Sequence, residues 1–198
     1  MGSLEANPSG PAIIEMRGIT IAFPGVLALD DVDFSLRSGE IHALMGENGA
    51  GKPTVIKALT GVDAIDAGSI SVGGTPVVFR TTSDAQAAGI STVYQEVNLC
   101  PNLSVGENVM LGHESRRGGR IDWRAVHERA AQHLESLGLQ IDTRTLLSSH
   151  SLAVQQLVAI SRAIVLDSRV LIIDEPTSSL DRGEAEQLFG VMRELRST

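Results

Sequence analysis

The chain has 198 residues, enough for one ordinary domain or for one domain with a small insert. Its net charge of −8 argues against a nucleic acid or an anionic lipid surface as the main partner. The single cysteine, Cys100, excludes an internal disulfide framework, and no apolar run approaches the roughly 20 residues that a membrane-spanning helix needs. Aromatic residues are only 3% of the chain, so we expect a mainly aliphatic core.

The first half of the chain is rich in expected strands. Residues 1–10 form a polar tail that we expect to be disordered. Strands are expected over residues 13–23, 32–36, 41–45, 69–72, 75–79 and 90–94. Gly73-Gly74 favours a two-residue hairpin turn between two of them, and a short helix is expected over 83–88.

After residue 97 the composition becomes helical. Ser104-Val-Gly-Glu107 is a capping box, which predicts a short helix that closes at Gly112. The sequence Arg-Arg-Gly-Gly-Arg at 116–120 indicates a flexible basic loop. Longer helices are expected over 122–138 and about 153–166. A buried strand follows at Val170–Asp174, of the kind found in parallel sheets, and a final helix begins near Asp181.

The stretch from Gly46 to Thr54 is the most informative part of the chain. It matches the phosphate-binding pattern G-x-x-x-x-G-K-[ST] at every fixed position but the last, where Pro53 stands. Its glycines allow backbone amides to wrap around phosphate oxygens at a helix N-terminus, and Lys52 supplies a full positive charge. The alternative is a turn that merely joins a strand to a helix, but lysine after the last glycine has no turn-forming purpose.

Two acidic residues follow the buried strand that begins at Val170. Asp174 ends the strand where open α/β sheets hold their ligands, so it can meet a metal ion directly or through water. Glu175 can orient or deprotonate a water for attack on a γ-phosphate. The alternative, a merely polar exit from the strand, loses weight because a phosphate loop lies upstream.

Together these motifs resemble the ATPase subunit of an ABC transporter. The closer resemblance is to the first nucleotide-binding domain of bacterial carbohydrate importers of the ribose, xylose and galactose type. The matching stretches are residues 23–30, 46–54, 93–104 and 173–181. The resemblance implies an α/β fold: a P-loop NTPase core with a mainly parallel sheet and an antiparallel β subdomain, plus an inserted helical subdomain. It assigns 11–198 to a partial domain, with the core at 11–96 and 166–198 and the helical part at about 97–165.

The resemblance also assigns roles to residues. Gln95 and Glu175 would be catalytic, and Thr54, Gln95 and Asp174 would hold Mg²⁺. ATP contacts would come from Phe23, Gly46, Glu47, Asn48, Gly49, Ala50, Gly51, Lys52, Pro53, Thr54 and Ser151. Phe23 would stack on adenine, although a core aromatic at a strand end remains open. Gln95 could instead be a polar residue leaving its strand. Asp181, in a loop that communicates across the family's dimer, would look the same as a plain helix cap.

Three features depart from the family pattern. Pro53 removes a hydroxyl and a backbone amide, for which Thr54 is the obvious substitute hydroxyl. The family's histidine strand would lie beyond Thr198, so we expect a fragment that lacks C-terminal strands and exposes a sheet edge. The signature motif at 150–156 is weakened, with His150 where leucine is usual and Val154 where a polar residue is usual. His150 is interpreted as a solvated cap residue.

Two functions remain open from the sequence. The first is an ATPase that couples ATP binding and hydrolysis to sugar import at the cytoplasmic face of the bacterial inner membrane. Its partners would be permease subunits, a second nucleotide-binding domain and, indirectly, a periplasmic sugar-binding protein. The second is a nucleotide-binding module that hydrolyses ATP weakly or not at all. A non-transport protein acting on nucleic acid is disfavoured by the acidic charge.

Overall fold

The computed structural model describes residues 11–47, 49–93, 99–165, 168–174 and 180–197. The chain divides into two compact units, residues 1–88 with 196–198, and residues 89–195. Each unit is described by itself. No helix in the described ranges is long and apolar enough to cross a membrane.

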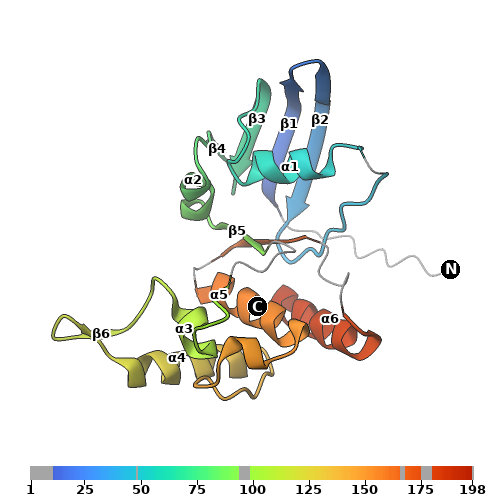
Figure 1. Cartoon of the computed structure of the whole chain (residues 1–198). Coiled ribbons are helices and arrows are strands. Elements are labelled where there is room, and N and C mark those ends of the chain that lie inside the picture. The colour runs from blue at the N-terminus through green and yellow to red at the C-terminus, as the bar shows by residue number, and fades with distance from the viewer. Residues whose placement is uncertain (1–10, 48, 94–98, 166–167, 175–179, 198) are drawn as a thin grey trace. The chain divides into compact units, whose positions relative to one another are not determined.

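The first unit is built on an antiparallel sheet of four strands in the order β2-β1-β3-β4 (Figure 1). The strands are β1 (Ala12–Phe23), β2 (Val26–Arg37), β3 (Ala67–Val72) and β4 (Thr75–Val77). Ile14 and Met16 of β1 are buried in alternation, as are Ile19 and Ile21 after a register shift between Met16 and Ile19, as expected for a strand with one face on a core. The predicted hairpin at Gly73-Gly74 is confirmed, with both glycines at positive φ.

Two helices belong to this unit, α1 (Lys52–Leu59) and α2 (Thr82–Ala87). After α1 the chain turns at Gly61, which has φ 69°. A Cβ there would lie 2.4 Å from the Thr81 carbonyl oxygen, so only glycine fits. The start of α2 is fixed by a capping box between Thr81 and Asp84.

The prediction of a buried strand over residues 41–45 is wrong for this structure. The segment has no strand conformation, and Ile41, Leu44 and Met45 are 47%, 39% and 86% exposed. An apolar run becomes a buried strand only where neighbouring strands take up its amide and carbonyl groups. Within the described residues, no strand pairs with this segment.

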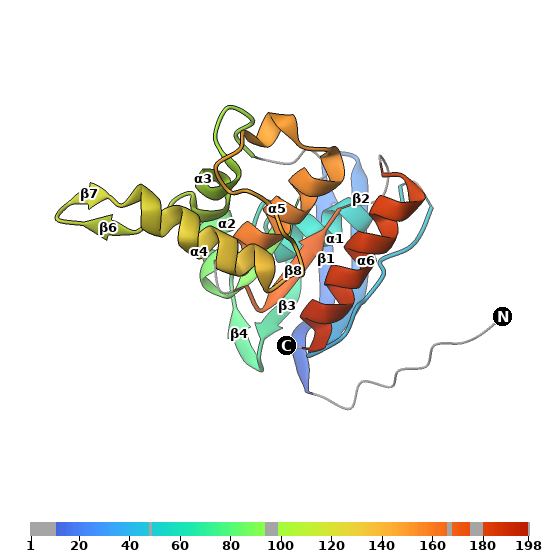
Figure 2. The same cartoon turned by 90° about the horizontal axis from the view of Figure 1, so that it is seen from below.

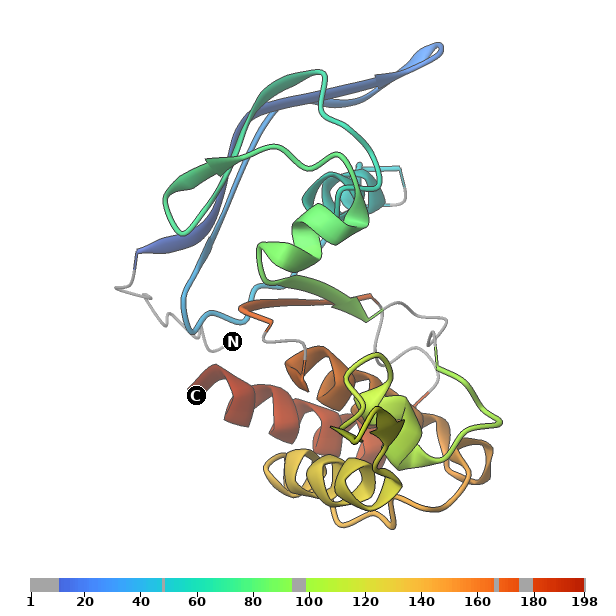
Figure 3. The same ribbon diagram turned by 90° about the vertical axis from the view of Figure 1, so that its left-hand side faces the viewer.

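The second unit contains the parallel part of the fold. Strands β5 (Ile90–Val93) and β8 (Val170–Ile173) pair in parallel from Ile90↔Val170 to Val93↔Ile173. Figure 3 shows them side by side, β5 in green and β8 in orange. The predicted strands over 90–94 and 170–174 are thereby confirmed within the described residues. Among the residues that the structure describes, parallel pairing is limited to these two strands, whereas the larger sheet is antiparallel.

Helices build most of the second unit. They are α3 (Val105–Met110), α4 (Trp123–Glu135), α5 (Leu152–Val165) and α6 (Arg182–Ser197), with a 3-10 turn at Leu147–Ser149. Their apolar faces enclose a core in which Val105, Leu134 and Leu147 have no exposed surface. The predicted capping box of α3 is confirmed, because Glu107 N donates to Ser104 Oγ while the Glu107 carboxylate accepts from Ser104 N.

Residues 116–120 were expected to form a flexible loop, and this expectation is wrong. They form a hairpin of two short strands, β6 (Arg116–Arg117) and β7 (Arg120–Ile121). Gly118 and Gly119 both have positive φ, which suits the tight turn whose twist matches paired strands. The turn signal was in the sequence, but the arginines around it favoured a solvated loop.

Candidate functional site

The loop from Gly46 to Thr54 leads directly into α1. Gly49 and Gly51 have φ 88° and 79°, the left-handed region that lets consecutive amides point to one side. Gly51 is also the N-cap residue of α1. A Cβ at Gly51 would lie 2.8 Å from Leu29 Cδ2 and 2.9 Å from the Ala28 carbonyl oxygen, so β2 leaves no room for a side chain. The glycine is therefore required by conformation and by space.

Lys52 folds back over this loop. Its ammonium donates to the Gly46 carbonyl oxygen at 2.6 Å and to the Glu47 carbonyl oxygen at 2.9 Å. The loop is closed further by the Ala50 amide, which donates to the Glu47 carbonyl oxygen. A lysine ammonium has three donors, so one remains for an incoming anion. The arrangement holds a positive charge at the start of a helix, where the helix dipole also favours an anion.

Pro53 lies in the first turn of α1, between Lys52 and Thr54. Its missing amide does not weaken the helix, because the first amides of a helix have no intrahelical partner. The first amide that returns into the helix ladder is that of Val55, which donates to the Gly51 carbonyl oxygen. The loop therefore folds normally with proline, and what it loses is one donor for an anion.

Phe23 lies at the end of β1, in the same unit as the loop. It pairs with Val26 across a turn made by Pro24 and Gly25, and it is 43% exposed. The alternative that the ring belongs to the core is wrong, because nearly half of its surface is open. Val26 and Leu27 beside it are also more than half exposed. An apolar surface of this kind is available for a flat ring to stack on.

Asp174 lies in the second unit at the carboxyl end of β8. Its amide donates to the Val93 carbonyl oxygen at 3.1 Å, which continues the parallel ladder by one residue. The chain therefore leaves β5 and β8 at the same edge of the strand pair, where α/β proteins commonly hold ligands. Asn48, Gln95 and Glu175 lie outside the described residues.

Each unit, taken by itself, carries an oxygen ligand of the kind that binds a magnesium ion together with phosphate groups. The described residues contain no group of three or more His, Cys, Asp or Glu side chains that could hold a metal. Magnesium does not require one, because it keeps several waters and binds through one or two protein oxygens plus substrate phosphates. The Thr54 hydroxyl and the Asp174 carboxylate, each partly exposed, are oxygen ligands of that kind.

Ser151 precedes α5 and acts as its cap. Its hydroxyl accepts from the Val154 amide at 3.4 Å, and its carbonyl oxygen accepts from the Gln155 amide. The neighbouring His150 is a cap residue, as predicted, because it caps the C-terminus of the 3-10 turn at Leu147–Ser149. It is only partly solvated, and its Nε2 lies 2.6 Å from Thr145 Oγ1. Sequence reasoning missed Thr145, since a lone threonine in a loop carries no signal for a partner five residues ahead.

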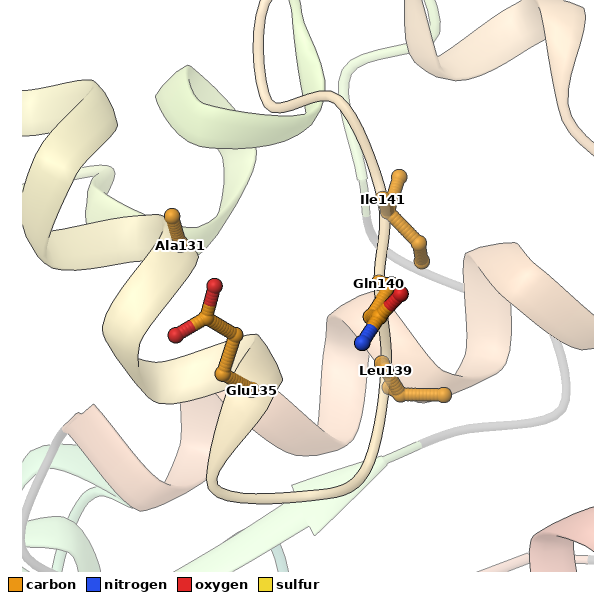
Figure 4. Close-up of a pocket in the computed structure, with 5 residues that line it drawn as sticks. All are labelled: Ala131, Glu135, Leu139, Gln140 and Ile141. Atoms are coloured by element: carbon orange, nitrogen blue, oxygen red, sulfur yellow. The ribbon is translucent and has the colours of Figure 1, made fainter.

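A separate pocket lies in the second unit between α4 and the segment after it. Ala131, Glu135, Leu139, Gln140 and Ile141 line it, as Figure 4 shows. None of the predicted site residues contributes to this pocket. The carboxylate of Glu135 faces it, and a carboxylate repels phosphate groups. It is therefore not the phosphate-binding site.

The glycine loop at the start of α1 and the mixed parallel and antiparallel sheets are those of a P-loop NTPase. The sequence profile of the ABC transporter family matches residues 29–178, most of the chain. The chain therefore belongs to the ABC transporter family. Among solved structures, the ADP conformation of an ATP-binding cassette of an ABC transporter is 25% identical with a TM-score of 0.83. The match covers 94% of this chain and 78% of that one.

Curated relatives narrow the resemblance to sugar import. A fructose import ATP-binding protein of Bifidobacterium longum is 64% identical over 187 residues, which is 94% of this chain and 36% of the relative. A galactofuranose transporter ATP-binding protein of Escherichia coli is 53% identical over 184 residues, 93% of this chain and 37% of the relative. This chain thus spans little more than a third of the length of these relatives.

Proposed function

We propose that this chain is the ATP-binding and ATP-hydrolysing part of a sugar importer. The observation that carries the proposal is the loop at 46–54, in which Lys52 donates to the Gly46 and Glu47 carbonyl oxygens and Gly49 and Gly51 are left-handed. The names of the relatives, which import fructose or transport galactofuranose, support a sugar as cargo. The proposal includes the division into a core (11–96 and 166–198) and a helical subdomain (about 97–165).

In this proposal the triphosphate of ATP enters the loop. Lys52 gives its third donor to the β- and γ-phosphates, and the amides of Gly49 and Gly51 donate to the anion. Phe23 stacks on adenine, and Ser151 meets the γ-phosphate of a partner domain. Mg²⁺, held by Thr54, Gln95 and Asp174, would neutralise developing charge on the phosphates.

Hydrolysis is assigned to two residues. Gln95 orients a water molecule and Glu175 accepts its proton as the water oxygen attacks the γ-phosphorus. The bond from that phosphorus to the β-phosphate oxygen breaks, which gives ADP and phosphate. Closure of two nucleotide-binding domains around ATP would then drive the permease subunits at the cytoplasmic face of the inner membrane, with a periplasmic protein delivering the sugar.

The alternative function, a module that binds ATP but turns it over weakly, is favoured by Pro53. A lost charge-assisted hydrogen bond costs about 1.5–3 kcal/mol, roughly tenfold or more in affinity. The loop itself folds with proline, so Pro53 lowers the affinity for ATP and not the stability of the fold.

The variant Pro53→Ser tests both functions, because it restores the amide and the hydroxyl together. ATP affinity and turnover are measured separately, with Mg²⁺ and after its removal by a chelator. We expect tighter ATP binding and faster Mg²⁺-dependent turnover in the variant. Pro53→Ala is the matched control, since it restores the amide alone. If all three proteins bind ATP equally, the assigned role of position 53 is wrong.

A further inference from the structure

The hairpin β6–β7 is a rigid extension of the second unit. At its base the Asp122 amide donates to the Ser115 carbonyl oxygen at 2.8 Å. Arg129, two turns along α4, donates to Ser115 Oγ at 3.2 Å. Figure 2 shows the hairpin at the N-terminal end of α4, beyond the body of the helices. The three arginines of the hairpin are exposed, whereas Ile121 at its base packs against the core of the unit.

This region reverses the charge of the chain. Residues 113–129 carry five arginines against three acidic residues, whereas the whole chain has a net charge of −8. The three acidic side chains are engaged locally. Glu114 accepts from the Gly112 amide, Asp122 caps α4, and Glu128 pairs with Arg124. Among the described residues, no ion pair involves Arg116, Arg117 or Arg120.

The pairing inside the hairpin is unfavourable without a ligand. Arg117 lies directly opposite Arg120, and both are exposed. Like charges opposite one another destabilise a strand pair. Local features that work against folding concentrate where a protein has a function to perform. An anionic surface next to both arginines would offset this repulsion and would attract the hairpin.

Trp123 adds an exposed apolar side chain close to the hairpin in the sequence. It is the first residue of α4, two residues after β7, and it is 48% exposed. Tryptophan is enriched at membrane–water interfaces, where its ring lies at the level of the lipid headgroups. It is also the only tryptophan of the chain, so its fluorescence reports on this surface alone.

We propose that Arg116, Arg117, Arg120 and Trp123, the arginine patch, bind anionic phospholipid headgroups. The inference rests on the proposed function in so far as that function brings the chain to a membrane. Clusters of arginine beside a membrane attract anionic lipids, about fivefold in affinity for each charge near the surface. Because screening confines this attraction to about 10 Å, a local patch can bind lipid although the whole chain is acidic. The net charge of the whole chain argues against an anionic lipid surface as the main partner. The proposal therefore confines lipid binding to this local patch.

The test titrates the whole chain with vesicles of phosphatidylglycerol mixed with phosphatidylcholine, and with pure phosphatidylcholine vesicles. We expect Trp123 emission to shift to the blue with the anionic vesicles only, and to be quenched by brominated lipid. Raising the salt to about 1 M, where the screening length is about 3 Å, should release the chain. Sedimentation with the vesicles gives the same affinity without relying on the fluorophore.

Variants separate charge from structure. Changing Arg116, Arg117 and Arg120 together to Gln should weaken binding about a hundredfold, whereas changing all three to Lys should retain it. The matched control changes the exposed Arg144, Arg182 and Arg193 to Gln, which alters net charge equally and should leave binding intact. An equal loss of vesicle affinity in the control variant would mean that net charge alone determines binding, and it would overturn the proposal.

Two further results would overturn it. One is no binding of the unaltered chain to the anionic vesicles at low salt. The other is binding only when permease is present in the vesicles, which would assign the patch to an acidic protein segment. ATP binding is measured on the same samples, because the patch shares no residue with the loop at 46–54. Lipid binding without ATP binding, or the reverse, tells which proposal has failed.

Discussion

The helices of the second unit and the segment at 41–45 of the first unit differ in how they hold apolar residues. In the second unit the helices enclose side chains such as Val105 and Leu134 with no exposed surface. In the first unit the segment before the phosphate loop leaves Leu44 and Met45 at the surface. Helices satisfy their backbone groups internally, whereas a strand depends on neighbours. A helix can therefore form before its apolar face meets distant partners, whereas an apolar run needs a neighbouring strand before it becomes a buried strand.

The largest contrast is expected from the same substitution in both places. Leu134→Ala should lower the free energy of unfolding by about 2–5 kcal/mol, because it leaves a cavity in a packed core. Leu44→Ala should cost less than about 1 kcal/mol, because that side chain is already 39% exposed. Urea unfolding followed by circular dichroism gives both values. Similar losses would mean that the segment at 41–45 is packed after all.

Within the first unit, the loop at 46–54 should tolerate substitutions less well than the segment before it. Gly51→Ala combines a left-handed backbone, about 1–2 kcal/mol, with close contacts to Leu29 and Ala28. Gly49→Ala has the same backbone penalty but open space around the added methyl group. We expect Gly51→Ala to destabilise the chain more in urea unfolding. An equal loss of stability in the two variants would show that β2 shifts to make room for the methyl group and that its close approach to Gly51 is unimportant.

In the second unit, the capping box of α3 should contribute a smaller amount to the free energy of unfolding. Ser104→Ala removes the acceptor of the Glu107 amide and should cost about 1 kcal/mol. Ser136→Ala, at the exposed end of α4, is the control and should change little. Thermal unfolding of the two variants measures the difference. No difference would mean that water replaces the cap at no cost.

The smallest effect is expected from pH. The hydrogen bond from the Ser104 hydroxyl, with that from its amide, lowers the pKa of Glu107 below its ordinary value of 4.5. Stability from this carboxylate is therefore complete above pH 4.5 and is lost as pH falls through the lowered pKa. Stability curves of the chain and of Glu107→Gln should converge in acid. A constant gap between them would exclude this contribution.

Local signals in the sequence predicted much of the fold. The capping box at Ser104, the turn at Gly73-Gly74 and the apolar strand from Val170 each depend on residues within a few positions. Sequence reasoning failed where distant partners decide. The run from Ile41 has the composition of a buried strand but no strand beside it, and the glycine turn at 118–119 was outweighed by its arginines.

The candidate site likewise combines features that local sequence predicts with features that depend on distant residues. The left-handed glycines and the position of Lys52 followed from the loop pattern alone. The exposure of Phe23 and the contact of His150 with Thr145 did not, because both depend on which residues lie nearby in space. The roles of Gln95 and Glu175 stay predictions, since these residues lie outside the described residues.

The most direct measurement is ATP binding by variants of the chain's two lysines, Lys52 and Lys57, which both lie in α1. Titration calorimetry with ATP and Mg²⁺ compares Lys52→Ala with Lys57→Ala. We predict that Lys52→Ala weakens binding about tenfold or more, because a charge-assisted contact is lost, while Lys57→Ala leaves it unchanged. Equal affinities for the two variants would contradict the assignment of the loop at 46–54 as the phosphate site.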